Sequence, residues 1–383
     1  MCEKLLEVAL LSPYHGGSHR AWAEGYAAYS GGRVTLFSLP ARFWKWRMHG
    51  GAVTLAEQFR QAASRPDLIL ATDMLDLTTF LALTRGETAG TTAVLYMHEN
   101  QLTYPLPTDG QSGPMRRQRG ERDLHYVFVN FASMLAANYV LFNSHYHLES
   151  WFTSLPNFLK HFPDYHLPHT ITSLRAKSSV LPVGLNLADL GPPDRAVERA
   201  APLILWNQRW EYDKNPGAFF TALLAMAEEG LAFEVALCGE QFGKRPFAFP
   251  DIIQQLGDRV VHVGYLPRQQ YRRWLWAADL TISTANHEFF GISILEAIAC
   301  HTFPLLPRRL SYPELLPQAC HDPCLYEDEA DLRRKLRHAL THRAEIRAQA
   351  AQLAPAALRY DWSHLALEYD HLLRQFAFGQ DSA

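Results

Sequence analysis

The chain has 383 residues, a length typical of two domains of ordinary size. Because 48% of the residues are hydrophobic and 20% are charged, the composition excludes an intrinsically disordered protein and predicts globular domains. A net charge of −3 excludes a uniformly basic surface, so any binding of nucleic acid depends on local basic patches.

Short apolar segments in the first half of the chain alternate with helix-like segments. Strands are predicted at 5–13, 33–39, 68–72, 92–97 and 139–144, and helices between them at 18–29, 53–64, 76–84 and 122–137. This succession predicts an open parallel sheet, and ligands of such sheets bind at the carboxyl ends of the strands.

Polar clusters follow three of these strands, with the sequences HGGSH at 15–19, HENQ at 98–101 and NSHYH at 143–147. The glycines of the first cluster allow the backbone to approach an anionic group, and simple turn chemistry is the alternative explanation. His98 is a candidate to bind a sugar hydroxyl or to transfer a proton, whereas a structural cap would need no ligand. The sequence contains no GxSxG motif, so a serine hydrolase is not predicted.

Two basic segments belong to the first half of the chain. One combines cations and rings in Arg42, Phe43, Trp44, Lys45, Trp46 and Arg47, and the other contains Arg116, Arg117, Arg119 and Arg122. Cations bind phosphate and aromatic rings stack on unpaired bases, so both segments are candidates for a nucleic-acid contact. The alternative is a packed aromatic turn and a solvated arginine-rich loop.

A second set of strands follows a linker rich in proline and charge at 185–202. These strands are predicted at 203–207, 234–238, 260–264, 280–283 and 302–306, with helices at 215–229 and 268–277 and an amphipathic helix within 363–383. Two such domains joined by a linker predict an enzyme with a cleft.

The segment 278–317 carries the strongest chemical signal. A buried strand precedes the loop TANHEFFG, and an apolar-faced helix begins near Ile292. Glu288 lies in the loop and Glu296 on the helix, and ionised carboxylates are strong acceptors for sugar and ribose hydroxyls. Gly291 allows a close approach of the backbone where the free amides of the helix can hold a diphosphate.

Two cations follow the first strand of the second half. Arg209 and Lys214 lie in the loop after 203–207, where a guanidinium and an ammonium can clamp a diphosphate. An ordinary solvated loop is the alternative for these two residues taken alone. Their position directly after a strand, together with the glutamates downstream, favours the clamp.

The five cysteines and the first residues of the chain bear on its compartment. The odd cysteine count argues against a disulfide framework and favours a reducing compartment. The N-terminal apolar run is short and acidic, so we interpret it as a strand and not as a signal peptide or membrane span. We therefore expect a cytoplasmic protein. Cys320 and Cys324 lack a second pair of ligands, so no metal site is expected there.

The combination of Arg209, Lys214, Glu288 and Glu296 across one domain resembles the GT-B glycosyltransferases, in particular glycosyltransferase family 4. The segments VVHVGYLP, YRRWLWAAD and EFFGISILEAIA resemble the donor-binding half of that family, and the resemblance extends over about 203–317. It implies an α/β fold with two Rossmann-like domains that face a central cleft.

Four segments of the first half extend the resemblance over nearly the whole chain. SPYHGGSHRAW, SLPARFWKWR, YMHENQLTYP and FNSHYHLESW resemble the tRNA-queuosine mannosyltransferases, a family similar to glycosyltransferase family 4. This resemblance implies that mannose moves from GDP-mannose to the cyclopentenediol of queuosine at the wobble position of an aspartate tRNA. It implies retention of the anomeric configuration and a partner tRNA bound at its anticodon region.

The resemblance also implies roles for single residues. The implied catalytic residues are His98, Arg209, Lys214 and Glu288, and the implied donor contacts are Gly16, Gly17, Arg209, Lys214, Glu288, Phe290, Gly291, Ile292 and Glu296. Arg209 and Lys214 are expected to bind the diphosphate, Glu288 the sugar hydroxyls and Glu296 the ribose. The expected tRNA contacts are Arg42, Trp44, Lys45, Trp46, Arg47, Glu99, Asn100, Arg116, Arg117 and Arg119.

This chain departs from the family pattern at two points. The usual Gly-Arg-Leu opening of the Arg/Lys motif is here Asn-Gln-Arg-Trp, which changes the local loop, and Phe289 and Phe290 precede Gly291. The sequence contains no Asp-x-Asp metal motif, so we expect no cofactor and no requirement for a divalent metal.

The predicted domains are 1–187 for the acceptor tRNA and 200–365 for the nucleotide sugar, followed by a C-terminal helix and tail at 366–383. Other readings remain open. A family-4 enzyme with a lipid or small-glycan acceptor would use the basic aromatic segment as a membrane face, although we expect no membrane partner. A catalytically silent tRNA-binding module and a nucleotide-sugar epimerase are further alternatives.

Overall fold

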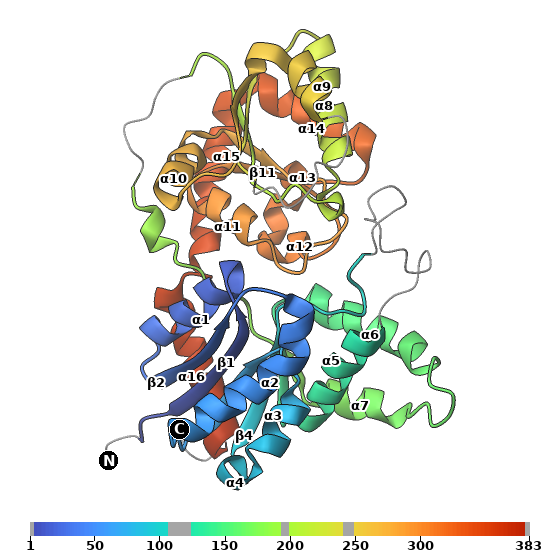
Figure 1. The fold of residues 1–383 in the computed structure, drawn as a ribbon. Coiled ribbons are helices and arrows are strands. Elements are labelled where there is room, and N and C mark those ends of the chain that lie inside the picture. The colour runs from blue at the N-terminus through green and yellow to red at the C-terminus, as the bar shows by residue number, and fades with distance from the viewer. Residues whose placement is uncertain (1–3, 106–123, 193–198, 240–248, 380–383) are drawn as a thin grey trace. The chain divides into compact units, whose positions relative to one another are not determined.

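The structure is a computed structural model that describes residues 4–105, 124–192, 199–239 and 249–379 (Figure 1). The described chain divides into two compact units. The first contains 4–105, 124–186 and 360–379, and the second contains 187–192, 199–239 and 249–359. The expected tRNA contacts Arg116, Arg117 and Arg119 lie outside the described residues.

The first unit is built on a parallel six-stranded sheet with the order β2-β1-β3-β4-β5-β6. Its strands are β1 (Glu7–His15), β2 (Arg33–Pro40), β3 (Leu68–Thr72), β4 (Thr92–Met97), β5 (Tyr139–Phe142) and β6 (Ser178–Val180). All five residues of β3 are buried, as expected for a central strand that is covered on both faces.

Helices cover both faces of this sheet because the chain reverses its direction across the sheet at β1. The helices are α1 (Gly17–Tyr29), α2 (Trp44–Gln61), α3 (Leu77–Leu83), α4 (Arg85–Thr88), α5 (Leu124–Ala136), α6 (His145–Leu159), α7 (His169–Ala176) and α16 (Trp362–Phe378). Right-handed crossovers in opposite directions place α1 and α2 on opposite faces. Helix α1 packs with α16, whereas α2 packs with α3 and α5 (Figure 1).

The C-terminal helix α16 is part of the first unit. Its first residue, Trp362, is fully buried, and its backbone N–H donates to Leu185 O over 2.9 Å. Gly25 and Gly184 make room for the indole, since a Cβ added at Gly25 would lie 2.0 Å from Trp362 Nε1 and one at Gly184 would lie 2.4 Å from Trp362 Cδ2.

The second unit contains a parallel six-stranded sheet with the order β12-β11-β10-β7-β8-β9. Its strands are β7 (Leu203–Trp206), β8 (Glu234–Leu237), β9 (Val260–Val263), β10 (Leu280–Ile282), β11 (Phe303–Pro307) and β12 (Leu325–Tyr326). Its α-helices are α8 (Pro216–Glu228), α9 (Phe249–Leu256), α10 (Arg268–Ala277), α11 (Ile292–Ala299), α12 (Tyr312–Leu315), α13 (His321–Cys324), α14 (Glu329–Thr341) and α15 (Arg343–Leu358).

Each sheet has one topological switch point, where neighbouring strands continue in opposite directions across the sheet. In the first unit it lies between β1 and β3, and in the second it lies between β7 and β10. Loops at the carboxyl ends of such strand pairs diverge, and ligands of open α/β sheets bind in the crevice between them. The topology therefore singles out the loops after β7 and β10.

The predicted strands all occur, but one predicted helix boundary was wrong. The helix expected at 53–64 begins already at Trp44, so the basic aromatic segment forms the first turn of α2 and not a separate loop. The sequence analysis also did not identify the short edge strands β6 and β12 or the helices α6, α7, α9, α14 and α15.

Candidate functional site

The two loops at the switch point of the second unit are joined to each other by hydrogen bonds. The loop after β7 ends in a short 3-10 turn at Tyr212–Lys214, and Asn215 follows with a φ of 48°. The Thr284 hydroxyl, in the loop after β10, lies 3.0 Å from Lys214 O and 2.9 Å from Asn215 O. The Asn286 N–H donates to Asp213 O over 2.7 Å. These contacts hold Lys214 and Glu288 at fixed positions.

Lys214 is a buried cation surrounded by oxygen atoms of His287, Glu288 and Asp213. Its Nζ donates to His287 O over 2.8 Å and lies 3.2 Å from Glu288 Oε2 and 3.3 Å from Asp213 Oδ2. Only 7% of the Lys214 side chain is exposed and none of the Asp213 side chain, so the charges interact with little screening by water.

The charges of this cluster reinforce one another. Burial lowers the pKa of the Lys214 ammonium, but Glu288 and Asp213 raise it more, and the pKa lies above its ordinary value. Burial raises the pKa of the Glu288 carboxyl, but Lys214 and the Phe290 N–H lower it more, and the pKa lies below its ordinary value. At neutral pH the site therefore holds a lysine cation and a glutamate anion.

His287 lies in the same loop as a neutral imidazole. Burial, and then the nearby Lys214 cation, lower the pKa of His287 from 6.5 to about 4. Its ring packs edge-on against Phe289, with ring centroids 4.4 Å apart. Lys214 donates its hydrogen bond to the backbone oxygen of His287, so this contact with the lysine does not require the imidazole.

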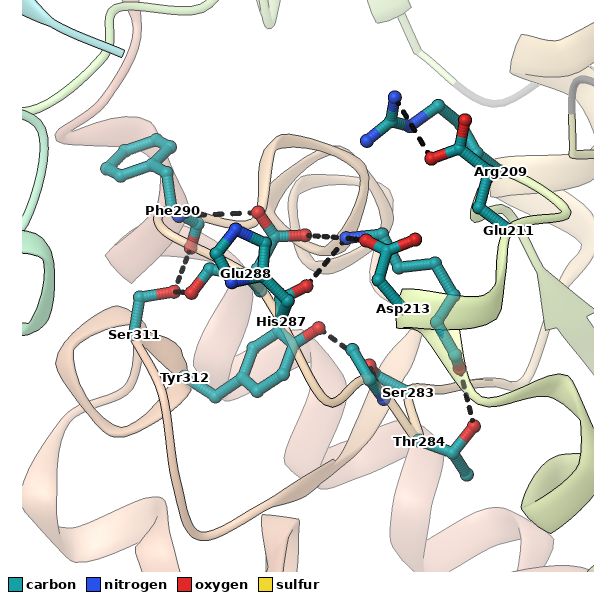
Figure 2. A network of polar contacts seen from close by, with 12 residues as sticks. Arg209, Glu211, Asp213, Ser283, Thr284, His287, Glu288, Phe290, Ser311 and Tyr312 are labelled. Carbon is teal, nitrogen blue, oxygen red and sulfur yellow. Dashed lines mark hydrogen bonds and ion pairs between the residues drawn. The ribbon is translucent and has the colours of Figure 1, made fainter. Parts of the chain in front are cut away.

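The start of α11 is held next to Glu288. Glu288 Oε1 accepts the Phe290 N–H over 3.3 Å, and the Ser311 hydroxyl donates to Phe290 O over 2.9 Å (Figure 2). Gly291 has a φ of 112°, which favours glycine, and a Cβ there would lie 2.9 Å from Leu315 Cδ1. The helix itself begins at Ile292, so its first amides belong to the same corner as Glu288.

Arg209 differs from Lys214 in its exposure. Its side chain is 43% exposed, and its Nη1 lies 3.3 Å from Glu211 Oε2. The guanidinium is close enough to lower the pKa of both Lys214 and His287, although burial contributes more to each. The loop after β7 therefore brings the two predicted cations into one electrostatic field, with Lys214 inside the protein and Arg209 at its surface.

Glu296 lies on α11 in a second polar cluster of the same unit. Its Oε1 accepts from Arg268 Nη1, and its Oε2 lies 3.2 Å from Tyr271 OH. Asn207 Nδ2, just after β7, donates to the same Tyr271 oxygen over 2.9 Å. This network orients the carboxylate with groups from β7, α10 and α11.

The predicted residues of the first unit follow β1 and β4. Gly16 ends the loop before α1 and packs closely, since a Cβ there would lie 2.4 Å from Ala41 Cβ, whereas Gly17 has a φ of 51° and open space around it. The Glu99 side chain is half-buried. Asn100 is fully buried, and its Oδ1 accepts from the Thr103 N–H over 2.8 Å, a contact that closes the turn after β4.

His98 is enclosed by aromatic rings. Its ring centroid lies 4.5 Å from that of His19, 4.6 Å from that of Trp22 and 4.7 Å from that of Tyr96. Its backbone N–H donates to Asp73 Oδ1 over 3.0 Å. Burial and the neighbouring histidines lower the pKa of His98 well below its ordinary value, so the imidazole is neutral at neutral pH.

The basic aromatic segment forms the N-terminal turn of α2. Trp44 faces the protein and packs beside Tyr126, with ring centroids 5.2 Å apart, whereas Trp46 is 64% exposed. Lys45 Nζ lies 5.5 Å from the ring centroids of both Trp44 and Tyr126. Arg47 Nε donates to Pro40 O over 3.1 Å.

Several residues of these sites were not singled out from the sequence. Asp213 forms an ion pair with the predicted Lys214. The position of this acidic residue next to the lysine in the sequence was a signal that could have indicated the pair. Ser311, Tyr271 and Arg268 contact predicted residues from segments more than 20 positions away, and the sequence pattern gives no sign of such pairing.

Two general properties complete the description. No group of three or more His, Cys, Asp or Glu side chains that could hold a metal ion occurs among the residues that the structure describes. None of the helices in the described ranges combines the length and apolar character needed to cross a membrane.

Comparisons with known proteins define the class. A family model described as "Glycosyl transferase-like" matches residues 218–370. Sucrose-phosphate synthase from Thermosynechococcus elongatus has a TM-score of 0.72 at 16% identity, over 97% of this chain and 98% of that chain. The catalytic domain of starch synthase IV from Arabidopsis thaliana has a TM-score of 0.68 at 12% identity, over 98% of this chain and 100% of that chain. With the two parallel sheets, these matches define a glycosyltransferase with the GT-B fold, as the sequence predicts.

The family follows from closer relatives. The family model described as "tRNA-queuosine alpha-mannosyltransferase N-terminal" matches residues 7–185. A tRNA-queuosine alpha-mannosyltransferase of Drosophila melanogaster is 33% identical over 324 residues, which cover 81% of this chain and 82% of that protein. The chain belongs to the tRNA-queuosine alpha-mannosyltransferase family.

Proposed function

We propose that this chain transfers mannose from GDP-mannose to the cyclopentenediol of queuosine at the wobble position of aspartate tRNA. The acceptor is supported by the Drosophila relative, whose name states queuosine tRNA and mannosyl transfer and which covers four fifths of this chain. The observation that carries the transfer chemistry is the buried Lys214 ammonium at the switch point of the second unit, beside an ionised Glu288. The partners are then a queuosine-containing tRNA and a nucleotide sugar.

The cations supply what a leaving nucleotide requires. Breaking the bond between the sugar C1 and the phosphate oxygen increases the negative charge on the diphosphate and leaves positive charge on the sugar ring. Lys214 and Arg209 are proposed to bind the diphosphate, and the first amides of α11 at Gly291 and Ile292 add the positive end of a helix dipole. Fixed cations stabilise this charge without reorganisation during the reaction.

The carboxylates are proposed to bind hydroxyls and not to exchange protons. Since Lys214 holds the pKa of Glu288 below its ordinary value, Glu288 is ionised at neutral pH and can only accept hydrogen bonds, which suits sugar hydroxyls. Glu296 is assigned to the ribose, with Arg268 and Tyr271 fixing its orientation. Neither glutamate is assigned as a nucleophile, and the configuration at C1 is retained by attack from the same face.

The first unit is proposed to bind the acceptor, and its His98 to contact a sugar hydroxyl. The neutral His98 is assigned to a sugar hydroxyl, because its aromatic neighbours fix the ring and its low pKa leaves it uncharged. Gly16, which precedes α1, and Gly17, its first residue, are proposed to let a backbone amide approach the donor or acceptor. The anticodon region is assigned to the surface around α2.

The proposal is tested by offering the purified protein a panel of nucleotide sugars with queuosine-containing aspartate tRNA. Digested nucleosides are then analysed by mass spectrometry. We expect a hexose on queuosine with GDP-mannose, and little with UDP-glucose, UDP-galactose or GDP-fucose. Equal transfer from a UDP-sugar would contradict the assigned donor, and transfer to queuosine-free tRNA would contradict the assigned acceptor.

A further inference from the structure

Two aromatic side chains at the start of α2 project into solvent. Phe43, which immediately precedes α2, is 79% exposed, and Trp46, in the first turn of α2, is 64% exposed. Single exposed apolar residues are common, but two large exposed rings three positions apart at the start of one helix need an explanation. We propose that Phe43 and Trp46 form a stacking platform for unpaired nucleotides of the tRNA anticodon loop, an inference that rests on the proposed function.

The backbone at Phe43 is strained for a residue that buries nothing. Phe43 precedes the helix with a φ of 52° and a ψ of 57°, in the left-handed region that bulky side chains rarely adopt. Trp46 N and Arg47 N donate to Phe43 O over 2.8 and 3.1 Å, so the start of the helix holds this conformation. A glycine would satisfy the same geometry at lower cost. Strain at an exposed ring that is followed and preceded by exposed cations, as here by Lys45 and Arg42, points to a role for the ring.

Trp46 lies on a seat made by a glycine in the next turn of α2. A Cβ added at Gly50 would lie 2.5 Å from Trp46 Cε2 and 2.6 Å from Trp46 Cζ2. Glycine inside a helix is unfavourable relative to alanine, so Gly50 is explained by the space it gives the indole. One face of the ring therefore lies on the helix backbone while the rest of the ring remains exposed, as a stacking surface requires.

Cations beside the rings give the platform its charge. Arg42 and Lys45 are exposed, and they alternate in sequence with Phe43 and Trp46. Lys45 is held over the rings of Trp44 and Tyr126, which fixes the position of its ammonium. Aromatic faces for bases and cations for the phosphates between them are the features by which proteins hold single-stranded nucleic acid. Trp44, predicted as a contact, packs inward and is a support of this surface.

The occupant we assign is a single-stranded RNA loop. A duplex does not expose base faces for stacking, whereas the nucleotides of an anticodon loop are unpaired. Because the stacking face of a base is common to all four nucleotides, the platform would add affinity for the loop without reading its sequence. Recognition of queuosine itself remains with the catalytic site.

The first test removes one ring and relieves the strain at the same position. Phe43→Gly keeps the left-handed backbone, so we expect an unchanged or higher Tm, yet the Kd for queuosine-containing tRNA should rise about tenfold. The KM for GDP-mannose should not change, because the donor residues are not altered. Tyr165→Gly is the matched control: Tyr165 is 81% exposed with a φ of 48°, but its neighbour in sequence is the anion Asp164.

A second variant keeps both rings and disturbs only the seat. Gly50→Ala should leave the Tm unchanged or raise it, because alanine favours the helix, but it displaces the Trp46 ring and should also weaken tRNA binding about tenfold. A tRNA Kd within twofold of wild type for both Phe43→Gly and Gly50→Ala would overturn the proposal.

Two controls separate the remaining outcomes. Binding of wild type, but not of Phe43→Gly, to phosphatidylglycerol vesicles, with tRNA binding equal in both, would assign the surface to a membrane and also overturn the proposal. If wild type itself transferred no hexose to queuosine, the proposed function would fail, and the stacking platform that rests on it would fail as well. If wild type transferred hexose and both variants bound tRNA normally, only the stacking platform would fail.

Discussion

At the scale of single residues, the two predicted cations of the donor site are not equivalent. Lys214 is buried between Asp213 and Glu288, whereas Arg209 is 43% exposed beside Glu211. The sequence places both residues in one loop and gives no reason to distinguish their roles. The structure separates a buried cation that also stabilises the fold from a cation whose side chain lies partly at the surface.

This difference in burial predicts a large loss of stability for one variant and almost none for the other. Lys214→Ala leaves two carboxylates without their shared cation, so the free energy of unfolding should fall by roughly 3–5 kcal/mol. Arg209→Ala should change it by no more than about 0.5 kcal/mol, while turnover falls roughly 100-fold or more. Urea denaturation and initial rates measure both. Normal turnover in Arg209→Ala would contradict the clamp, and normal stability in Lys214→Ala would contradict the buried ion pairs.

The neutral His287 predicts a dependence of stability on pH. Burial lowers the folded-state pKa from 6.5 to about 4, so between these values the unfolded chain binds a proton that the folded chain does not. The free energy of unfolding should therefore decrease as the pH falls through this window, by on the order of 3 kcal/mol.

The contribution of His287 is isolated by comparison with a variant. His287→Asn keeps the backbone oxygen that binds Lys214, so its stability should fall less steeply between pH 6.5 and 4 than that of wild type. Denaturation at several pH values in this range gives both slopes. Parallel slopes would show that the imidazole is already protonated in the folded state.

The assignment of the cations also predicts how the reaction depends on metal. If Arg209, Lys214 and the start of α11 stabilise the leaving diphosphate, transfer should continue at a similar rate after dialysis against EDTA. A glycosyltransferase with a known metal requirement, treated in parallel, controls for complete chelation. Loss of transfer with EDTA and recovery with Mg²⁺ or Mn²⁺ would show that the cations do not suffice.

At the scale of elements, the strands were predictable except for the short edge strands β6 and β12. Strands β3 and β7 are buried on both faces, so they are continuous apolar runs that a sequence shows directly. Strand β12 has two residues and β6 has three, which is too short to show an apolar run or an alternation of apolar and polar residues. The start of α2 was missed because the residue before it is Phe43, which makes no side-chain capping hydrogen bond and gives no capping signal in the sequence.

The candidate site was predictable as a set of residues but not as an arrangement. The loops with Lys214 and Glu288 could be placed after strands from local sequence. Their contact depends on β7 and β10 being neighbours in the sheet, although the two residues are 74 positions apart. The pairing of Glu296 with Arg268 and Tyr271 likewise depends on how α10 and α11 pack, which a single sequence does not specify.

The C-terminal helix supplies a prediction at this scale. Trp362 fills a slot bounded by Gly25 and Gly184, so Trp362→Ala should lower the free energy of unfolding by about 3–5 kcal/mol. Gly25→Ala should also destabilise the protein, because its Cβ would clash with the indole. In the double variant the clash is absent, so its loss of unfolding free energy should be smaller than the sum of the two single losses by at least about 1 kcal/mol. Additive effects in urea denaturation would contradict direct contact.

At the scale of the whole molecule, two units of the same architecture present different chemistry in the loops that follow their strands. The second unit has a buried lysine between carboxylates at β7 and β10, and the first has glycines and an enclosed neutral histidine after β1 and β4. The charges that we assign to the leaving diphosphate thus belong to one unit. The other combines an uncharged site with the cation and ring surface of α2.

The central claim is that this enzyme glycosylates queuosine in tRNA. The most direct measurement compares two preparations of the same aspartate tRNA, one with queuosine and one with unmodified guanosine at the wobble position, each incubated with the protein and GDP-mannose. Nucleoside mass spectrometry should find a single hexose on queuosine in the first and no hexose in the second. An unmodified queuosine in the first, from protein shown by calorimetry to bind GDP-mannose, would contradict the account.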